Sequence, residues 1–212
     1  MTFKTKARIF AFVLFAVSLA PVLAAPEADL DSVCRDLTAY QVTAGSFIQQ
    51  RTAPKLKRPL TSSGTFVICG EGIAWKTEKP VSSLLAVSRD KIIQAAPDGR
   101  KSVIDGSGNQ TFRNIAETLA TVFSGDRTAH EKNFHVSFAP NGSGWIITLV
   151  PKDSTIASAM QKIIMEGTSG SESFINSVRI EEQGGTGITY SFSDQKHRDG
   201  LTDDEKSFFT AE

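Results

Sequence analysis

Few side chains in this sequence could carry out chemistry, and the histidines are the first to consider. His130 and His135 lie five residues apart beside a turn, and His197 is far from both. No cysteine or carboxylate completes a ligand set of recognisable spacing around them. We therefore expect solvated or half-buried imidazoles and no metal site.

Motifs for nucleophiles, phosphates and calcium are also missing. The chain has no G-x-S-x-G elbow, which would expose a nucleophilic serine. Gly106-x-Gly108 precedes a helical pattern, but neither a third glycine nor a GK[ST] ending follows, so turn chemistry explains it better. Asp203-Asp204-Glu205 is typical of a helix N-terminus rather than a calcium loop. The sequence predicts a protein that is not an enzyme and binds no cofactor.

The N-terminus predicts the compartment. Basic residues at positions 4–8 precede an uncharged apolar run over 9–20, and small residues follow at 21–25. This is the pattern of a secretory signal peptide, and the apolar run is too short for a comfortable membrane span. We expect cleavage after Ala24 or Ala25, which leaves one domain over 25–212 in the periplasm. Loss of Lys4, Lys6 and Arg8 leaves 20 basic against 23 acidic residues, a balance that argues against a protein that binds nucleic acid or an anionic membrane.

Two cysteines, Cys34 and Cys69, remain after cleavage. A disulfide between them is permitted in an oxidising compartment, provided that their Cα atoms come within about 7 Å. The alternative is a pair of free thiols. A reactive thiol is disfavoured because neither a C-x-x-C motif nor an adjacent histidine would activate it.

Lys55, Lys57 and Arg58 form the basic cluster of the chain, between two strand-like stretches. Such a cluster is either a solvated loop or a docking site for an acidic partner. Both interpretations stay open at the level of the sequence.

Most of the chain alternates apolar and polar residues with the period of two that marks β-strands. Residues 45–80 contain three strand-like pieces, with Phe66 and Ile68 on one face of the sheet and Ile73 and Trp75 on one face of the next strand. Asp98-Gly99 and later Asn-Gly and Gly-Gly pairs are hairpin turns, so neighbouring strands should be antiparallel.

Helical spacing interrupts the strands at three places. Residues 27–41 carry one apolar stripe, residues 115–123 carry another that could form a lid, and Thr202 stands three before Glu205 at the capping-box spacing. We expect a mainly β (α+β) fold: an incomplete, strongly curved antiparallel half-barrel with helices covering its concave face. A closed barrel or a two-sheet sandwich would give a similar pattern.

Large apolar residues are in surplus on the predicted sheet faces. An ordinary core explains each one alone, but a half-barrel of this size has more inner face than two helices can fill. Burial of an acyl chain contributes ~0.8 kcal/mol per CH₂ group, so such a face could bind lipid tails. The predicted lipid-binding cavity consists of Phe47, Phe66, Ile68, Trp75, Leu85, Val87, Leu119, Val122, Phe123, Phe138, Trp145, Ile147, Leu149, Val178, Ile180 and Phe192.

Three successive motifs resemble the LolA-like lipoprotein-carrier family. They are G-x-F-x-Q at 45–49, L-x-R-P-L-x-S-S-G-x-F at 56–66 and G-I-x-W-x-T-x-x-P at 72–80. Later F-x-V-x-F and W-x-I-x-L stretches continue the match over nearly all of the predicted mature chain. Gly70-Glu71 stands where the well-studied carriers have an arginine before the tryptophan strand, so the sequence is similar to a divergent member of the family.

The resemblance implies a carrier without covalent chemistry. Its apolar interior would shield the acyl chains of a lipoprotein that passes from an inner-membrane ABC transporter to an outer-membrane receptor. We expect a monomer. A non-lipoprotein apolar cargo, such as a glycerolipid, a fatty acid or a polyene, is one alternative, and a lipid-sensing regulatory module is another.

Overall fold

The computed structural model describes residues 29–88, 91–105, 125–170 and 172–210. The predicted signal peptide lies outside these ranges. So does the predicted helix at 115–123, which carries Leu119, Val122 and Phe123. None of the helices in the described ranges is long and apolar enough to cross a membrane.

The described strands form one antiparallel sheet of eleven strands, in the order β6-β5-β4-β3-β2-β1-β11-β10-β9-β8-β7. Since β6 and β7 lie at opposite edges, the sheet does not close, and the predicted half-barrel is confirmed over a closed barrel or a sandwich. The strands are β1 (Val42–Thr52), β2 (Leu60–Cys69), β3 (Gly72–Lys79), β4 (Ser83–Ser88), β5 (Lys91–Ala95), β6 (Lys101–Asp105), β7 (Phe134–Asn141), β8 (Gly144–Pro151), β9 (Met160–Thr168), β10 (Phe174–Glu182) and β11 (Gly187–Arg198).

The strand order follows from hairpins on either side of one long-range pairing. Within the run β1 to β6, and within the run β7 to β11, each pair of consecutive strands is hydrogen-bonded. The predicted turns lie where expected, with Gly99 and Gly142 in the left-handed region at φ of 82° and 60°. The exception is β1, which also pairs with β11 from Val42↔Arg198 to Thr52↔Gly187. The two halves of the chain therefore join at the middle of the sheet.

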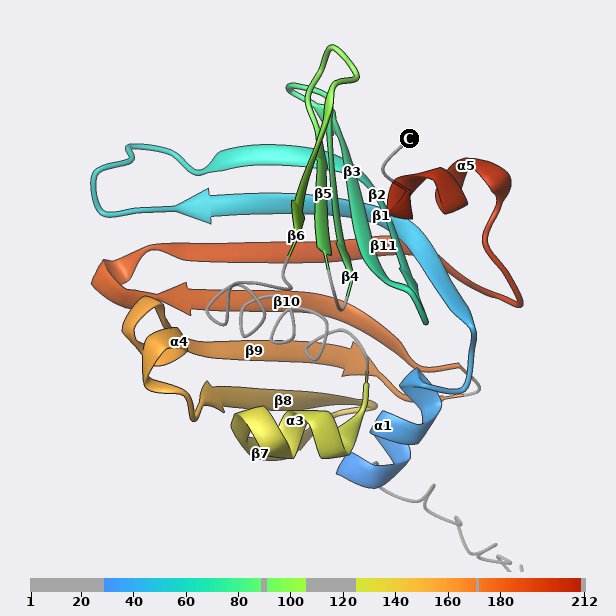
Figure 1. Ribbon diagram of the computed structural model, residues 1–212. Coiled ribbons are helices and arrows are strands. Elements are labelled where there is room, and N and C mark those ends of the chain that lie inside the picture. Colours follow the sequence, from blue (N-terminus) through green and yellow to red (C-terminus); the bar gives the residue numbers. More distant parts are fainter. Residues whose placement is uncertain (1–28, 89–90, 106–124, 171, 211–212) are drawn as a thin grey trace, which may run out of the picture.

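The sheet is sharply bent. Figure 1 shows β3 to β6 running across the direction of β8 to β11, with β1 and β2 between the two walls. The larger hydrophobic cluster contains residues of both walls, including Trp75 of β3 and Ile163 of β9. It occupies the inner side of the bend.

Short helices lie around this sheet: α1 (Leu30–Leu37), α3 (Arg127–Asn133), α4 (Ser154–Ala159), α5 (Asp203–Lys206) and the 3₁₀ turns η1 (Gln183–Gly185) and η2 (Ser207–Phe209). The predicted first helix is present but shorter than the expected 27–41, because 38–41 form a turn, and its apolar stripe packs Val33 against the larger cluster. The side chain of Asp29 caps it by accepting from the backbone N–H of Ser32 at 2.7 Å. Helix α3 was not predicted from the sequence.

A smaller cluster covers the opposite face of the β3–β5 wall. Ala74, Ala86 and Ile93 point to this outer face and contact Phe209 of the C-terminal segment. The predicted capping box is present, because Thr202 accepts from the backbone N–H of Glu205 and Glu205 accepts from that of Thr202. The C-terminal helix is thus anchored on the outside of the bend.

Candidate functional site

An apolar row crosses the inner face of the sheet from strand to strand. Residues directly opposite each other on paired strands share a face. Trp75 pairs with Phe66 on one side and with Leu85 on the other. In the second wall, Met165 pairs with Val178 and with Ile147. Both rows belong to the same buried cluster.

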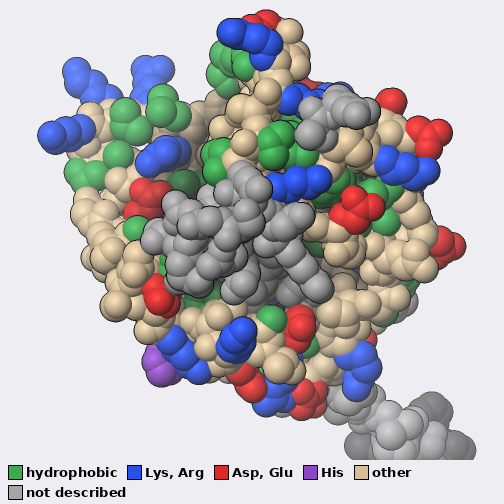
Figure 2. All heavy atoms as spheres, in the orientation of Figure 1, with side chains coloured by type: hydrophobic (Ala, Val, Ile, Leu, Met, Phe, Trp, Pro, Cys, Tyr) green, Lys and Arg blue, Asp and Glu red, His purple; other side chains and the backbone are tan. Residues whose placement is uncertain are grey.

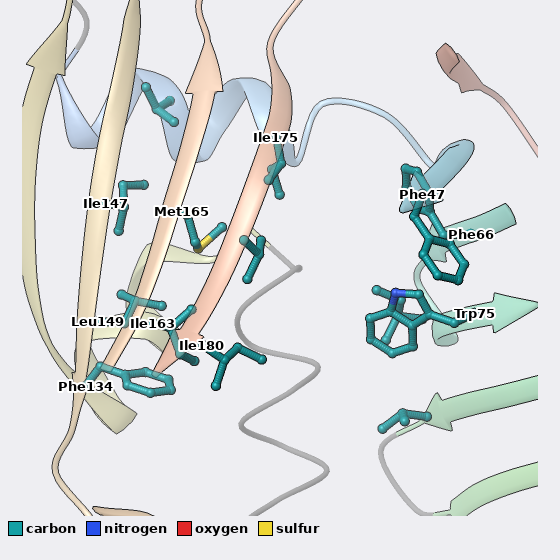
Figure 3. Packing of buried hydrophobic residues seen from close by; sticks show 14 of the residues in the cluster. Phe47, Phe66, Trp75, Phe134, Ile147, Leu149, Ile163, Met165, Ile175 and Ile180 are labelled. Atoms are coloured by element: carbon teal, nitrogen blue, oxygen red, sulfur yellow. The ribbon is translucent and has the colours of Figure 1, made fainter. Parts of the chain in front are cut away.

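The structure brings the predicted cavity residues of the described ranges together on this face. They are Phe47, Phe66, Ile68, Trp75, Leu85, Val87, Phe138, Trp145, Ile147, Leu149, Val178, Ile180 and Phe192, and all belong to or pack against the larger cluster. Figure 3 shows labelled side chains of both walls, such as Met165 and Trp75, on opposite sides of one interior. We call this set of positions the inner face.

Sequence reasoning missed several members of the inner face. Ile163 and Met165 lie on it and are fully buried, as is Phe134, and Tyr190 packs against them. Each of these residues stands two positions from another inner-face residue in its own strand, or directly opposite one in a paired strand. The alternation of apolar residues was therefore a signal that could have identified them. Ile163 and Met165 were obscured by the continuous apolar run that contains them.

Aromatic rings gather where β1, β2, β3 and β11 meet. The Tyr190 ring centroid lies 6.1 Å from that of Phe47, 6.0 Å from Trp75 and 6.2 Å from Phe192. Phe66 meets Phe192 edge-on at 4.8 Å. Burial raises the pKa of Tyr190, partly offset by Arg51, so its phenol stays neutral at neutral pH. The centre of the inner face is therefore uncharged.

Charged side chains of the same strands point to the outer face of the sheet or stand at the end of a strand, at the rim of the inner face. Lys76 follows Trp75 and faces outward, and Lys162 pairs with Glu181 on the outer face at 3.3 Å. Arg51 lies at the rim and meets Glu182 at 3.5 Å. The inner face can bury apolar groups, but its described middle positions offer no acid, base or nucleophile.

The expectation of solvated or half-buried histidines is wrong for His130. It is fully buried on α3, the helix that the sequence analysis did not predict. His197 is half-buried, as expected, and stacks between Tyr40 and Phe174 with ring centroids at 3.8 and 4.4 Å. Burial lowers the pKa of His197. Within the described residues, no three His, Cys, Asp or Glu side chains are grouped to hold a metal ion.

The two cysteines are free thiols in the structure, so the disulfide alternative is not formed there. Cys34 is buried on α1, and Cys69 ends β2 and packs against the outer cluster. Burial raises the pKa of Cys34 to about 11 and also raises that of Cys69. Both thiols are therefore protonated at neutral pH and poorly nucleophilic.

The family model for "Outer membrane lipoprotein carrier protein LolA" matches residues 38–209. The chain belongs to the LolA family. The matched range begins just after α1 and ends at Phe209, so it includes every described strand and the C-terminal segment. A search among curated proteins gives no match.

Solved structures of similar fold share little sequence with this LolA-family chain. A DUF1329-family protein from Desulfovibrio piger is 10% identical with a TM-score of 0.50, over 85% of this chain and 94% of the other. A putative outer-membrane lipoprotein-sorting protein domain from Vibrio parahaemolyticus is 10% identical with a TM-score of 0.47, over 85% and 98%. The lipoprotein LppX from Mycobacterium tuberculosis is 12% identical with a TM-score of 0.42, over 82% and 97%.

Proposed function

We propose that this LolA-family protein is a periplasmic carrier that shields the acyl chains of lipoproteins, or of related lipids, on its inner face. The observation that carries the proposal is the continuous, uncharged apolar surface that spans both walls of an open sheet. An open sheet with its apolar residues inside can take up and release a chain at its edges. The carrier makes and breaks no covalent bond.

Apolar contact area supplies the affinity in this proposal. Each methylene group that leaves water contributes about 0.8 kcal/mol, whatever head group the chain carries. Selection between a lipoprotein and a simpler lipid then depends on groups outside the inner face. Transfer from an inner-membrane ABC transporter to an outer-membrane receptor requires partners that bind the loaded and empty carrier differently. The carrier acts as a monomer.

Mass spectrometry of the protein's bound lipid tests the cargo. The chain is exported in a Gram-negative host, recovered from the periplasm without detergent and extracted with organic solvent. We expect a diacylated peptide or lipoprotein in the extract, and a mature N-terminus after position 24 or 25. A fatty acid, phospholipid or polyene in the extract would support the carrier function but show that the cargo is not a lipoprotein. An empty extract, with no uptake of added lipid, would contradict the proposal.

Trp75→Asp tests the inner face directly. Trp75 is 6% exposed and lies between Phe66 and Leu85, so a carboxylate there would place an unpaired charge against the bound chain. We expect the amount of co-purified lipid to fall at least tenfold, measured per mole of folded protein by circular dichroism and mass spectrometry.

Lys76→Asp is the matched control. It introduces the same carboxylate one residue further along β3, on the outer face. We expect it to keep the wild-type lipid content. Wild-type loading of folded Trp75→Asp would refute the role of the inner face.

A further inference from the structure

The loop between β1 and β2 concentrates positive charge, although the overall charge balance of the predicted mature chain argues against binding to an anionic membrane. It spans residues 53–59 and carries Lys55, Lys57 and Arg58, all exposed. The run 51–60 contains no aspartate or glutamate. Among the described residues, none of these three cations has a carboxylate oxygen within ion-pair distance. The neighbouring Arg51 is different, because Glu182 neutralises it.

The same corner also exposes two leucines: Leu56 lies between Lys55 and Lys57, and Leu60 is the first residue of β2. Leu56 is 38% exposed, and Leu60, where β2 begins, is 59% exposed. One exposed leucine is ordinary on a protein surface. Two exposed leucines beside three cations that form no ion pair with a described residue are a specific combination. Figure 2 shows Lys and Arg side chains next to hydrophobic ones at this corner of the molecule, at the upper left. The corner projects outward as a hairpin end (Figure 1).

We propose that this loop docks the protein on an anionic phospholipid bilayer. A bilayer surface presents phosphate groups directly above hydrocarbon, so it satisfies the cations and buries the leucines at the same time. Lysine side chains suit this arrangement because their methylene stems can lie in the apolar layer while the ammonium groups stay among the phosphates. An acidic protein surface would pair the cations but leave Leu56 and Leu60 in water.

The register of β1 and β2 relates the loop to the inner face. Leu60 pairs with Arg51, Ser62 with Gln49 and Gly64 with Phe47. Since alternate residues of a strand share a face, Leu60 stands on the same side of the sheet as Phe47. Docking through the loop would therefore hold one rim of the inner face against the membrane. The docking proposal goes beyond the carrier function and does not depend on it.

Vesicle flotation tests the docking with the exported protein recovered from the periplasm, before and after removal of bound lipid. The vesicles contain phosphatidylcholine alone or with about one quarter phosphatidylglycerol, a negative surface of the kind that attracts basic segments. We expect binding to the anionic vesicles, weakened as NaCl rises from about 0.05 to about 0.5 M because salt screens exposed charges. Vesicles of phosphatidylcholine alone, which carry no net charge, should bind little of the protein.

Two loop variants separate the contributions of charge and apolar contact. Each cation near an anionic surface strengthens binding about fivefold, so K55E/K57E/R58E should weaken binding by more than about a hundredfold. L56S/L60S should weaken it about tenfold and leave the remaining binding sensitive to salt. All the changed residues are exposed, in the loop or at the first position of β2, so both variants should keep an unfolding midpoint near that of the wild type.

A charge-matched variant completes the test. R35E/K132E/K196E reverses three other exposed cations and gives the same net charge as the loop variant. We expect it to bind anionic vesicles nearly as the wild type does. The proposal is overturned if the wild type does not bind these vesicles, if the matched variant loses as much binding as the loop variant, or if the cations bind only an acidic protein. Vesicle binding by lipid-free protein would support docking even if the cargo proposal fails.

Discussion

At the scale of single residues, the contact between Trp145 and Gly167 shows how tightly the second wall is built. Trp145 is fully buried, and its indole N–H donates to the carbonyl of Thr168 at 3.2 Å. A Cβ added at Gly167 would lie 2.1 Å from the Trp145 ring and 2.4 Å from the carbonyl oxygen of Phe174. The ring fits over the sheet because position 167 has no side chain.

Gly167→Ala should therefore destabilise the protein. The extra methyl group must move a fully buried ring or a strand backbone, and overpacking of this kind costs about 1–3 kcal/mol. Urea unfolding measures the loss. Gly70→Ala is the control, because a Cβ there meets nothing within 4 Å, and its stability should stay within about 0.5 kcal/mol of the wild type. Equal stabilities for the two variants would contradict this account of the Trp145 site.

At the scale of elements, the C-terminal segment braces the first wall from outside. Arg198 donates to Glu205 at 2.7 Å, and Lys101 donates to the backbone carbonyls of Ser207 and Thr210 at 3.2 and 3.1 Å. Burial alone would raise the pKa of Glu205, but the hydrogen bonds from Arg198 and Thr202 outweigh it and lower that pKa. The segment thus stabilises the wall without occupying the inner face.

Phe209→Ala should destabilise the fold and spare lipid binding. The Phe209 side chain is 5% exposed against Ala74, Ala86 and Ile93, and truncation of a buried phenylalanine costs about 3–5 kcal/mol. We expect a lower urea midpoint with an unchanged lipid content in the fraction that remains folded. Asp204→Ala, on the exposed side of α5, should change stability by less than about 0.5 kcal/mol. Loss of lipid at unchanged stability would contradict a purely structural role for Phe209.

At the scale of the whole molecule, the two walls should unfold as one unit. β1 pairs with both β2 and β11, and the larger cluster contains residues of both walls. Trp75 reports on one wall and Trp145 on the other. In lipid-free Trp145→Phe and Trp75→Phe proteins, we expect the fluorescence and far-ultraviolet circular dichroism transitions in urea to coincide within each variant. Separate midpoints for the remaining tryptophan and the backbone signal would show that the walls unfold independently.

Much of the fold and of the inner face follows from local patterns. Alternation with a period of two decides which side chains of one strand share a face, so Phe66 and Ile68, or Ile73 and Trp75, could be assigned to one side before their strands were paired. Turn residues such as Gly99, and the capping pair Thr202 and Glu205, determine the local backbone through interactions that span only two to four residues. The family motifs lie within these same segments.

Other features depend on residues far apart in the chain. The pairing of β1 with β11 joins segments about 150 residues apart, and packing between distant strands rather than local propensity selects it. The burial of His130, the free state of Cys34 and Cys69 and the need for glycine at position 167 follow from what lies opposite each residue. The sequence by itself determined which residues form an apolar face. It also favoured an open, curved sheet. Only the tertiary structure decided that β1 and β11 join the two halves and that the first wall is braced from outside, because these properties arise from contacts between elements that no local pattern encodes.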